Sequence, residues 1–218
     1  VWLFLLPLFA SVGHRMIPFF TASALPYVQV NRPDWPWWVL LAGSVIHTLL
    51  QLADMAALKW LSDVPMTVAA FYLSYSWGFR QSFKNPLLAI LHIGFAWVGI
   101  AMLLSAVQSA TQFFSHDTLF IFGQAPLHAL TIGCFATLMI GMGTRVTFGH
   151  SGLPFKVDTG LKLMFAGIQS VAVMRVLADV LLLQHSNWLY LASGLVWLAS
   201  FAPWVWRYLP AYWRVRAD

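Results

Sequence analysis

Seven apolar runs dominate this sequence, each close to the ~20 residues that cross the hydrocarbon core of a bilayer as a helix. They are residues 1–24, 37–59, 64–82, 86–108, 122–147, 159–183 and 187–207. In lipid such runs form helices, because a helix satisfies its own backbone hydrogen bonds. The sequence therefore predicts an all-α, polytopic transmembrane helical bundle with about seven membrane segments, folded as a single domain over residues 1–218.

The composition excludes a soluble domain. Hydrophobic residues make up 60% of the chain and charged residues only 9%, which leaves too few polar side chains to cover a water-exposed surface. The single cysteine, Cys134, lies in an apolar run, so a disulfide framework and a Cys-x-x-Cys motif are both excluded. The chain opens at Val1 on an apolar run without the basic region of a signal peptide, and we expect it to be the C-terminal part of a longer membrane protein.

The basic residues predict the orientation of the bundle. If successive connections alternate across the membrane, one side collects Arg15, Arg32, Arg80, Lys84, Arg145, Lys156, Lys162, Arg207, Arg214 and Arg216. Lys59 falls on the other side, and Arg175 lies within the sixth run. By the positive-inside rule, the first side and the C-terminus are cytoplasmic. The net charge of +5 is thus explained by orientation in a bilayer, and we expect no nucleic-acid partner.

Ionisable and other polar side chains inside the runs are the candidate functional residues, because each costs about 2.5–3.5 kcal/mol at mid-depth when charged. They form two predicted layers. The cytoplasmic layer holds His14, Arg15, His92, Arg145 and His150, and the outer layer holds Asp54, His128, Arg175 and Asp179, with His47 and Gln51 nearer mid-helix. We expect His92, Arg145 and His150 at nearly the same depth.

Two sets of polar residues in the outer half have open interpretations. His47, Gln51 and Asp54 share one helix face, either as a proton relay or ligand site, or as hydrogen bonds that only orient helices. Arg175 and Asp179 lie one turn apart and can pair. They form either a structural ion pair or a site where Arg175 neutralises a carboxylate or an anionic cofactor group.

The stretch "HALTIGCFATLMIGMGTRVTFGHSG" begins at His128 and ends at Gly152. Arg145 lies about 25 Å along the helix axis from His128, so this helix alone does not bring its two histidines to one metal. Gly133, Thr137 and Gly141 form a small-residue face that allows close approach of another helix. Neutral imidazoles from different helices beside an arginine suit a haem, a copper site or a polar packing layer.

This stretch resembles the most characteristic segment of the NnrS family, polytopic bacterial inner-membrane proteins associated with haem, copper and the response to nitric oxide. Three further pieces, "GHRMIPFFT", "NPLLAILHIGFAW" and "MRVLA", also match the family pattern. The resemblance covers nearly the whole chain. It implies about twelve membrane segments in the complete protein, of which these are the C-terminal seven.

The resemblance also implies cofactor-binding residues, which are Arg15, His92, His128, Arg145, His150 and Arg175. His92, His128 and His150 are the implied metal ligands, for a b-type haem and for copper. His14, His47, Gln51 and Asp54 match no family motif and are not expected to be ligands. We expect two sites, an outer one around His128 and Arg175 and a cytoplasmic one around His92, Arg145 and His150.

The leading hypothesis is therefore a haem- and metal-binding integral membrane protein of the nitric-oxide and nitrosative-stress response, associated with denitrification. Its expected partners are the lipid bilayer and nitric oxide or iron–nitrosyl species. The alternative is a transporter or channel in which the same residues line a proton or anion path. A third hypothesis is an assembly subunit whose buried polar groups only fix helix contacts. The residues contain no acid/base pair, nucleophile motif or phosphate loop, and the catalytic question stays open.

Overall fold

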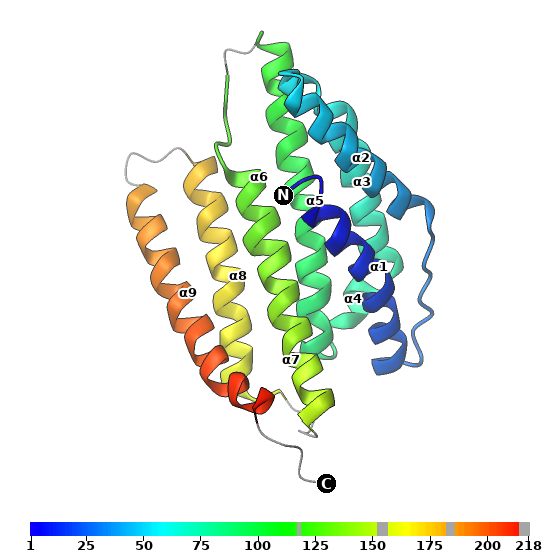
Figure 1. Ribbon diagram of the computed structural model, residues 1–218, viewed down its shortest axis with the longest axis vertical. Coiled ribbons are helices and arrows are strands. Elements are labelled where there is room, and N and C mark those ends of the chain that lie inside the picture. Colours follow the sequence, from blue (N-terminus) through cyan, green and yellow to red (C-terminus); the bar gives the residue numbers. More distant parts are fainter. Residues whose placement is uncertain (117–118, 152–156, 182–185, 214–218) are drawn as a thin grey trace.

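The computed structural model describes residues 1–116, 119–151, 157–181 and 186–213 (Figure 1). Over these residues the chain is helical and has no strand, which confirms the all-α prediction. The long helices are α1 (Leu5–Ala24), α2 (Trp35–Leu52), α3 (Trp60–Ser76), α5 (Pro86–Phe114), α7 (Thr137–Ser151), α8 (Thr159–Val180) and α9 (Ser186–Tyr208). The shorter segments are η1 (Ala56–Leu58), α4 (Phe79–Ser82), α6 (Ala125–His128), η2 (Ala129–Ala136) and η3 (Leu209–Tyr212).

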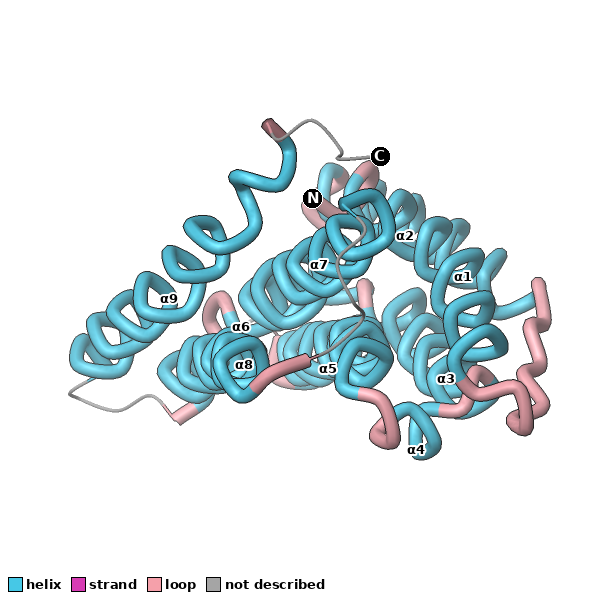
Figure 2. The backbone as a smooth tube through the Cα atoms, turned by 90° about the horizontal axis from the view of Figure 1, so that it is seen from below, coloured by secondary structure: helices cyan, strands magenta, loops and turns pink. Residues whose placement is uncertain are grey.

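Helix α5 forms the centre of the bundle (Figure 2). Asn85 begins it as an N-cap, whose side chain accepts a hydrogen bond from the Leu87 N–H (3.0 Å), and Pro86 occupies the first helical position. Helices α1 and α3 pack on one side of α5, and α6, η2 and α7 pack on another. Helix α9 is the outermost and contacts α8. A residue of α5 can therefore meet side chains from either half of the chain.

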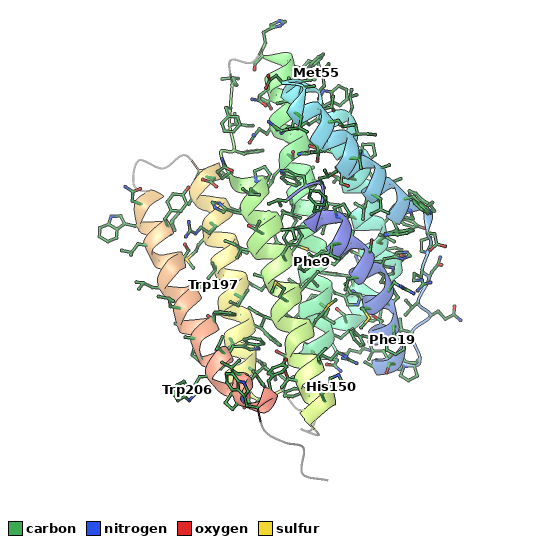
Figure 3. All side chains as sticks on the ribbon, in the orientation of Figure 1. Phe9, Phe19, Met55, His150, Trp197 and Trp206 are labelled. Carbon is green, nitrogen blue, oxygen red and sulfur yellow. The ribbon has the colours of Figure 1, made fainter. Side chains whose placement is uncertain are left out.

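The long helices alternate in direction, as the predicted topology requires (Figure 1). Met55 lies at one end of the bundle, and His150, Phe19 and Trp206 lie towards the other (Figure 3). These ends are called the Met55 end and the His150 end below. The predicted outer and cytoplasmic layers correspond to the Met55 end and the His150 end, respectively.

Four helical segments are long and apolar enough to cross a membrane among the described residues. They are Pro86–Phe114, Ala125–His150, Thr159–Val180 and Asn187–Tyr212. The prediction of about seven spans was therefore too high by this criterion. Polar residues lower the hydropathy of α1 and α2, and α3 has only 17 residues. The chain is nevertheless a multi-pass membrane protein in a lipid bilayer.

The helix from Ala125 to Ser151 approaches α5 closely through its small residues. A Cβ atom on Gly133 would lie 2.4 Å from the Trp97 ring, and one on Gly141 would lie 3.0 Å from the side chains of Ile90 and Leu91. This confirms the predicted small-residue face, with α5 as the partner helix. The segment η2 inside this helix is a π-helix, a feature often found at functional sites.

A chain of hydrogen bonds joins three helices beside the π-helix. The Trp97 indole donates to Gln169 Oε1 (2.9 Å), and Gln169 Nε2 donates to Thr137 Oγ1 (2.7 Å). Thr137 in turn donates to the carbonyl of Ile132 (3.3 Å), five residues earlier. These hydrogen bonds therefore connect α5 and α8 to the end of the π-helix.

Candidate functional site

The first candidate site lies at the Met55 end, where α6, α8 and α9 meet. His128 Nδ1 lies 2.9 Å from Asp179 Oδ2, and Tyr190 donates a hydrogen bond to the other oxygen of the same carboxylate. The Arg175 guanidinium lies over the Tyr190 ring, 5.1 Å from its centroid. His128, Arg175, Asp179 and Tyr190 are called the outer cluster below. His128 and Arg175 both contact Tyr190, whose ring centroid lies 6.5 Å from that of the His128 imidazole.

The contacts of Asp179 differ from those expected from the sequence. The sequence predicts an Arg175–Asp179 pair within α8, but the described residues contain no ion pair between them. The carboxylate faces His128 and Tyr190 instead, because packing against α6 and α9 supplies closer donors. Arg175 Nε is buried without a hydrogen-bond partner among the described residues, so the guanidinium has unused donor capacity.

The His128–Asp179 geometry leaves one ring nitrogen available. When Nδ1 carries the proton that the carboxylate accepts, Nε2 keeps its lone pair. This arrangement is the usual support for a histidine that ligates a metal. The His128 side chain is 21% exposed and that of Asp179 is 9% exposed. The imidazole is therefore fixed by a hydrogen bond and still partly accessible.

A second histidine–aspartate pair lies between α2, α3 and α5. His47 Nδ1 lies 2.7 Å from Asp63 Oδ1, and Ser62 (3.2 Å) and Ser105 (2.6 Å) donate to the same carboxylate. His47 is 1% exposed and Asp63 0%. His47 Nε2 has no partner among the described residues, and the Trp2 ring lies 4.6 Å from the imidazole. His47, Asp63, Ser62 and Ser105 are called the inner cluster below.

Asp63 was not predicted as a functional residue. The predicted third apolar run covers residues 64–82, so the Asp63 carboxylate lies one position outside it. The useful signal was the serine beside it in "LSDVP", since a hydroxyl next to a carboxylate can satisfy it inside a bundle. His47 does orient helices, as one of its two interpretations required, because its hydrogen bond joins α2 to α3.

Gln51 and Asp54 do not join His47, contrary to the predicted common face. Helix α2 ends at Leu52, and Asp54 follows it in the left-handed region with φ of 55°. Both side chains are exposed. Gln51 accepts a hydrogen bond from Lys59 Nζ (2.7 Å). Burial lowers the pKa of Lys59, and the Asp63 charge partly opposes that shift.

His92 lies nearer the His150 end and is 1% exposed. Its Nε2 is 2.9 Å from Thr21 Oγ1, and the Thr21 hydroxyl already donates to the Ile17 carbonyl (2.8 Å). His92 Nε2–H is therefore the donor to Thr21, because a hydroxyl has one proton to give. The lone pair remains on Nδ1, which is buried without a partner among the described residues.

The other predicted residues of this layer are spread out. The Arg145 guanidinium lies over the Phe20 ring at 4.1 Å, so α1 contacts both Arg145 and His92 through adjacent residues. His150 is exposed at the end of α7 (Figure 3), and Arg15 is exposed on α1. The structure brings Arg145 near the region of His92 and leaves Arg15 and His150 at the surface.

The predicted common depth of His92 and His150 is wrong. Gly141 packs against Ile90 and Leu91, so His92 is level with that turn of α7. His150 lies nine residues further, about 14 Å along the axis. Counting residues from the ends of apolar runs missed this offset, because the packing of α5 on α7 sets the register.

His14 has a structural environment. It is buried, and its Nε2–H donates a hydrogen bond to the Pro33 carbonyl (3.0 Å). Its ring stacks on that of Trp37, with the centroids 5.7 Å apart. Its place outside the family motifs agrees with this role. Among the described residues, no three His, Cys, Asp or Glu side chains lie close enough to share a metal ion.

Comparison with known proteins supports the sequence resemblance. Residues 1–216 match the family described as NnrS protein. No curated protein and no solved structure matches the chain. With the match covering nearly all of its length, and with helices that cross a bilayer, the chain belongs to the NnrS family and is a membrane protein of the nitric-oxide response.

Proposed function

We propose that this protein binds haem and metal in the bacterial inner membrane and protects the cell against nitric oxide and nitrosative stress during denitrification. The observation that carries the proposal is the state of two predicted ligands. His128 Nδ1 and His92 Nε2 are engaged by the protein, and His92 Nδ1 is buried without a hydrogen-bond partner among the described residues.

The outer cluster would hold a haem through His128 and Arg175. Asp179 orients the His128 ring, and the partial exposure of that ring leaves a route to Nε2. Arg175 Nε is buried without a hydrogen-bond partner among the described residues, and a guanidinium is a good match for a propionate. A haem bound here would supply the iron that binds nitric oxide.

The region of His92 is the second proposed site. Its Nδ1 is the available nitrogen, and Arg145 lies on the same side of α1, over Phe20. A separated imidazole at each site suits axial ligation of haem more than a closed copper centre, which takes several soft or nitrogen ligands. Copper stays a secondary proposal, with His150 as an exposed ligand at the His150 end.

The direct test is the visible spectrum and metal content of the purified full chain after expression with ample haem. We expect a Soret band that changes in His128→Ala and in His92→Ala. His116→Ala is the matched control, because His116 is exposed and outside both sites. The absence of bound haem and copper in the wild type would overturn the proposal, and an unchanged spectrum in both variants would overturn the ligand assignment.

The second candidate function is transport of protons, and the inner cluster is the observation that favours it. A fully buried imidazole–carboxylate pair is the type of group that relays protons in membrane proteins. The test is proton flux in liposomes, with His47→Phe as the blocked variant. Flux by a cofactor-free wild type that His47→Phe abolishes would favour transport over haem binding.

A further inference from the structure

A cleft of about 600 Å³ lies where α3 ends and α5 begins. Its walls are the last turns of α3, the short helix α4, the segment between α1 and α2, and one face of α5. None of the predicted site residues lines it. It borders the proposed His92 site, because Phe79 lines the cleft and its ring centroid lies 6.4 Å from that of the His92 imidazole.

The cleft is lined by polar and by apolar side chains. Arg80, Gln81 and Asn31 are exposed and form its polar mouth, on α4 and on the connection to α2. Phe71, which is 40% exposed, and Ala96 belong to its apolar part. Ala96 follows Pro86, the first residue of α5, by ten positions, so the cleft reaches about 15 Å into the span. This distance is about half the thickness of a hydrocarbon core.

The charge at the mouth is positive. Arg80 is exposed, and no carboxylate lines the cleft. The ion pairs of the described residues do not include Arg80. Lys84 lies close by in the chain and is held over the Tyr27 ring, 4.9 Å from its centroid. An anionic group bound at the mouth would therefore lie near Arg80 and Lys84, with no carboxylate among the described lining residues to compete for them.

Tyrosines flank the mouth on α3. Tyr72 and Tyr75 line the cleft and are 39% and 76% exposed. Tyrosine is enriched at the boundary between lipid and water, where its ring meets acyl chains and its hydroxyl meets headgroups. The mouth thus has the residue types of a lipid–water boundary. It lies on the side of the bundle that the sequence predicts to carry most of the basic residues.

We infer that this cleft binds one anionic phospholipid. The phosphate lies against the Arg80 guanidinium, and one acyl chain enters the apolar interior between Phe71 and Ala96. An anionic headgroup is favoured over a zwitterionic one because the mouth offers positive charge and no acid for a choline or ethanolamine group. These proposed contacts use none of the residues proposed to bind haem.

The test is native mass spectrometry of the purified full chain after equilibration with equal amounts of phosphatidylglycerol and phosphatidylcholine. We expect the wild type to retain one phosphatidylglycerol in preference to phosphatidylcholine. Arg80→Gln should reduce that retention about fivefold, the effect of one basic residue near a lipid phosphate. Arg32→Gln is the matched control, since Arg32 is also exposed at this end but does not line the cleft.

A second variant tests the apolar part. Ala96→Phe fills the interior without a change of charge and should also reduce retention, with circular dichroism reporting that each variant is folded. Equal retention of the two lipids by the wild type would overturn the proposal. So would equal losses in Arg80→Gln and Arg32→Gln, or unchanged retention in Ala96→Phe.

Discussion

The two histidine–aspartate pairs flank α5 and use the same contact, an imidazole Nδ1 against a carboxylate, at 2.7 Å and 2.9 Å. They differ in access. The inner pair is 1% and 0% exposed, whereas the outer pair is 21% and 9% exposed. The inner pair is thus buried between three helices, whereas the outer pair is partly exposed. This difference in exposure distinguishes a pair that fixes helices from a pair that can receive a ligand.

The pairs also lie at similar heights on α5. Ser105 of α5 donates directly to Asp63. On the other side, Gly133 packs against Trp97, and His128 lies five residues from Gly133 towards the Met55 end. That spacing brings His128 level with a turn of α5 near Met102. Changes in either pair can therefore be compared without a difference in membrane depth.

The largest expected effect is the loss of stability in Asp63→Ala. Removal of this carboxylate leaves the His47 and Ser105 groups buried without their acceptor, which costs about 3–5 kcal/mol. Asp179→Ala should cost less, because water reaches the outer pair. The measurement is thermal or denaturant unfolding in detergent. Equal losses in the two variants would contradict the burial argument.

The next effect concerns haem affinity. Asp179→Asn keeps the size of the side chain but weakens its hold on His128, and loss of such support typically costs about 10- to 100-fold in metal affinity. Asp63→Asn should leave haem affinity unchanged. Haem titration of the apoprotein measures both. A larger loss in Asp63→Asn would move the ligand assignment to the inner cluster.

A smaller effect is expected from Trp2→Ala. The Trp2 ring covers the His47 imidazole, so its removal should open the inner cluster to reagents. Labelling with diethyl pyrocarbonate, followed by peptide mass spectrometry, should detect modification of His47 in the variant and not in the wild type. His116 should react in both. Labelling of His47 in the wild type would mean that the pair is not sealed.

The smallest effect is expected at an exposed carboxylate, which serves as a reference for the two pairs. Asp158 caps α8 by accepting from the Leu161 N–H (2.9 Å) and pairs with Arg207. The backbone hydrogen bond from Leu161 and then the one from Arg207 lower the pKa of Asp158. A lowered folded-state pKa stabilises the protein above the unfolded pKa of about 3.9. That contribution is lost as the pH falls through the folded value.

Asp158→Asn should remove this contribution. The variant should unfold at a slightly lower temperature than the wild type at pH 7, and the difference should shrink below pH 4. Thermal unfolding across pH 3–7 measures it. A difference that grows as the pH falls would contradict the sign of the pKa shift.

The helices were predictable because each apolar run is a local property of the sequence. The runs 86–108 and 159–183 begin at the first residues of α5 and α8, although α5 continues six residues beyond its run, to Phe114. Helix ends were less predictable. Asp54 was placed on the second helix because the run continues to residue 59, but the helix ends at Leu52. The apolar residues after that point form only the short 3-10 segment η1 (Ala56–Leu58) and do not continue α2.

The pairing of side chains was the least predictable part. His128 with Arg175 could be anticipated from their common layer. The Asp63 and Tyr190 contacts depend on the register between helices, which no single run contains. The residues Arg15, His92, His128, Arg145, His150 and Arg175 stay predictions as cofactor-binding residues, since contacts within the protein do not test ligation.

The π-helix has a consequence for how mutations are designed in the helix that begins at His128. It contains more residues in each turn than an α-helix, so the rotational phase between His128 and Arg145 departs from 100° per residue. Deletion of one residue between Ala129 and Ala136 would convert the wide turn towards an α-helix while His128 kept its place on Asp179. Arg145 would then rotate about the helix axis relative to α1. The length of η2 therefore sets the angle about the helix axis between His128 and Arg145, the residues of this helix that belong to the two proposed sites.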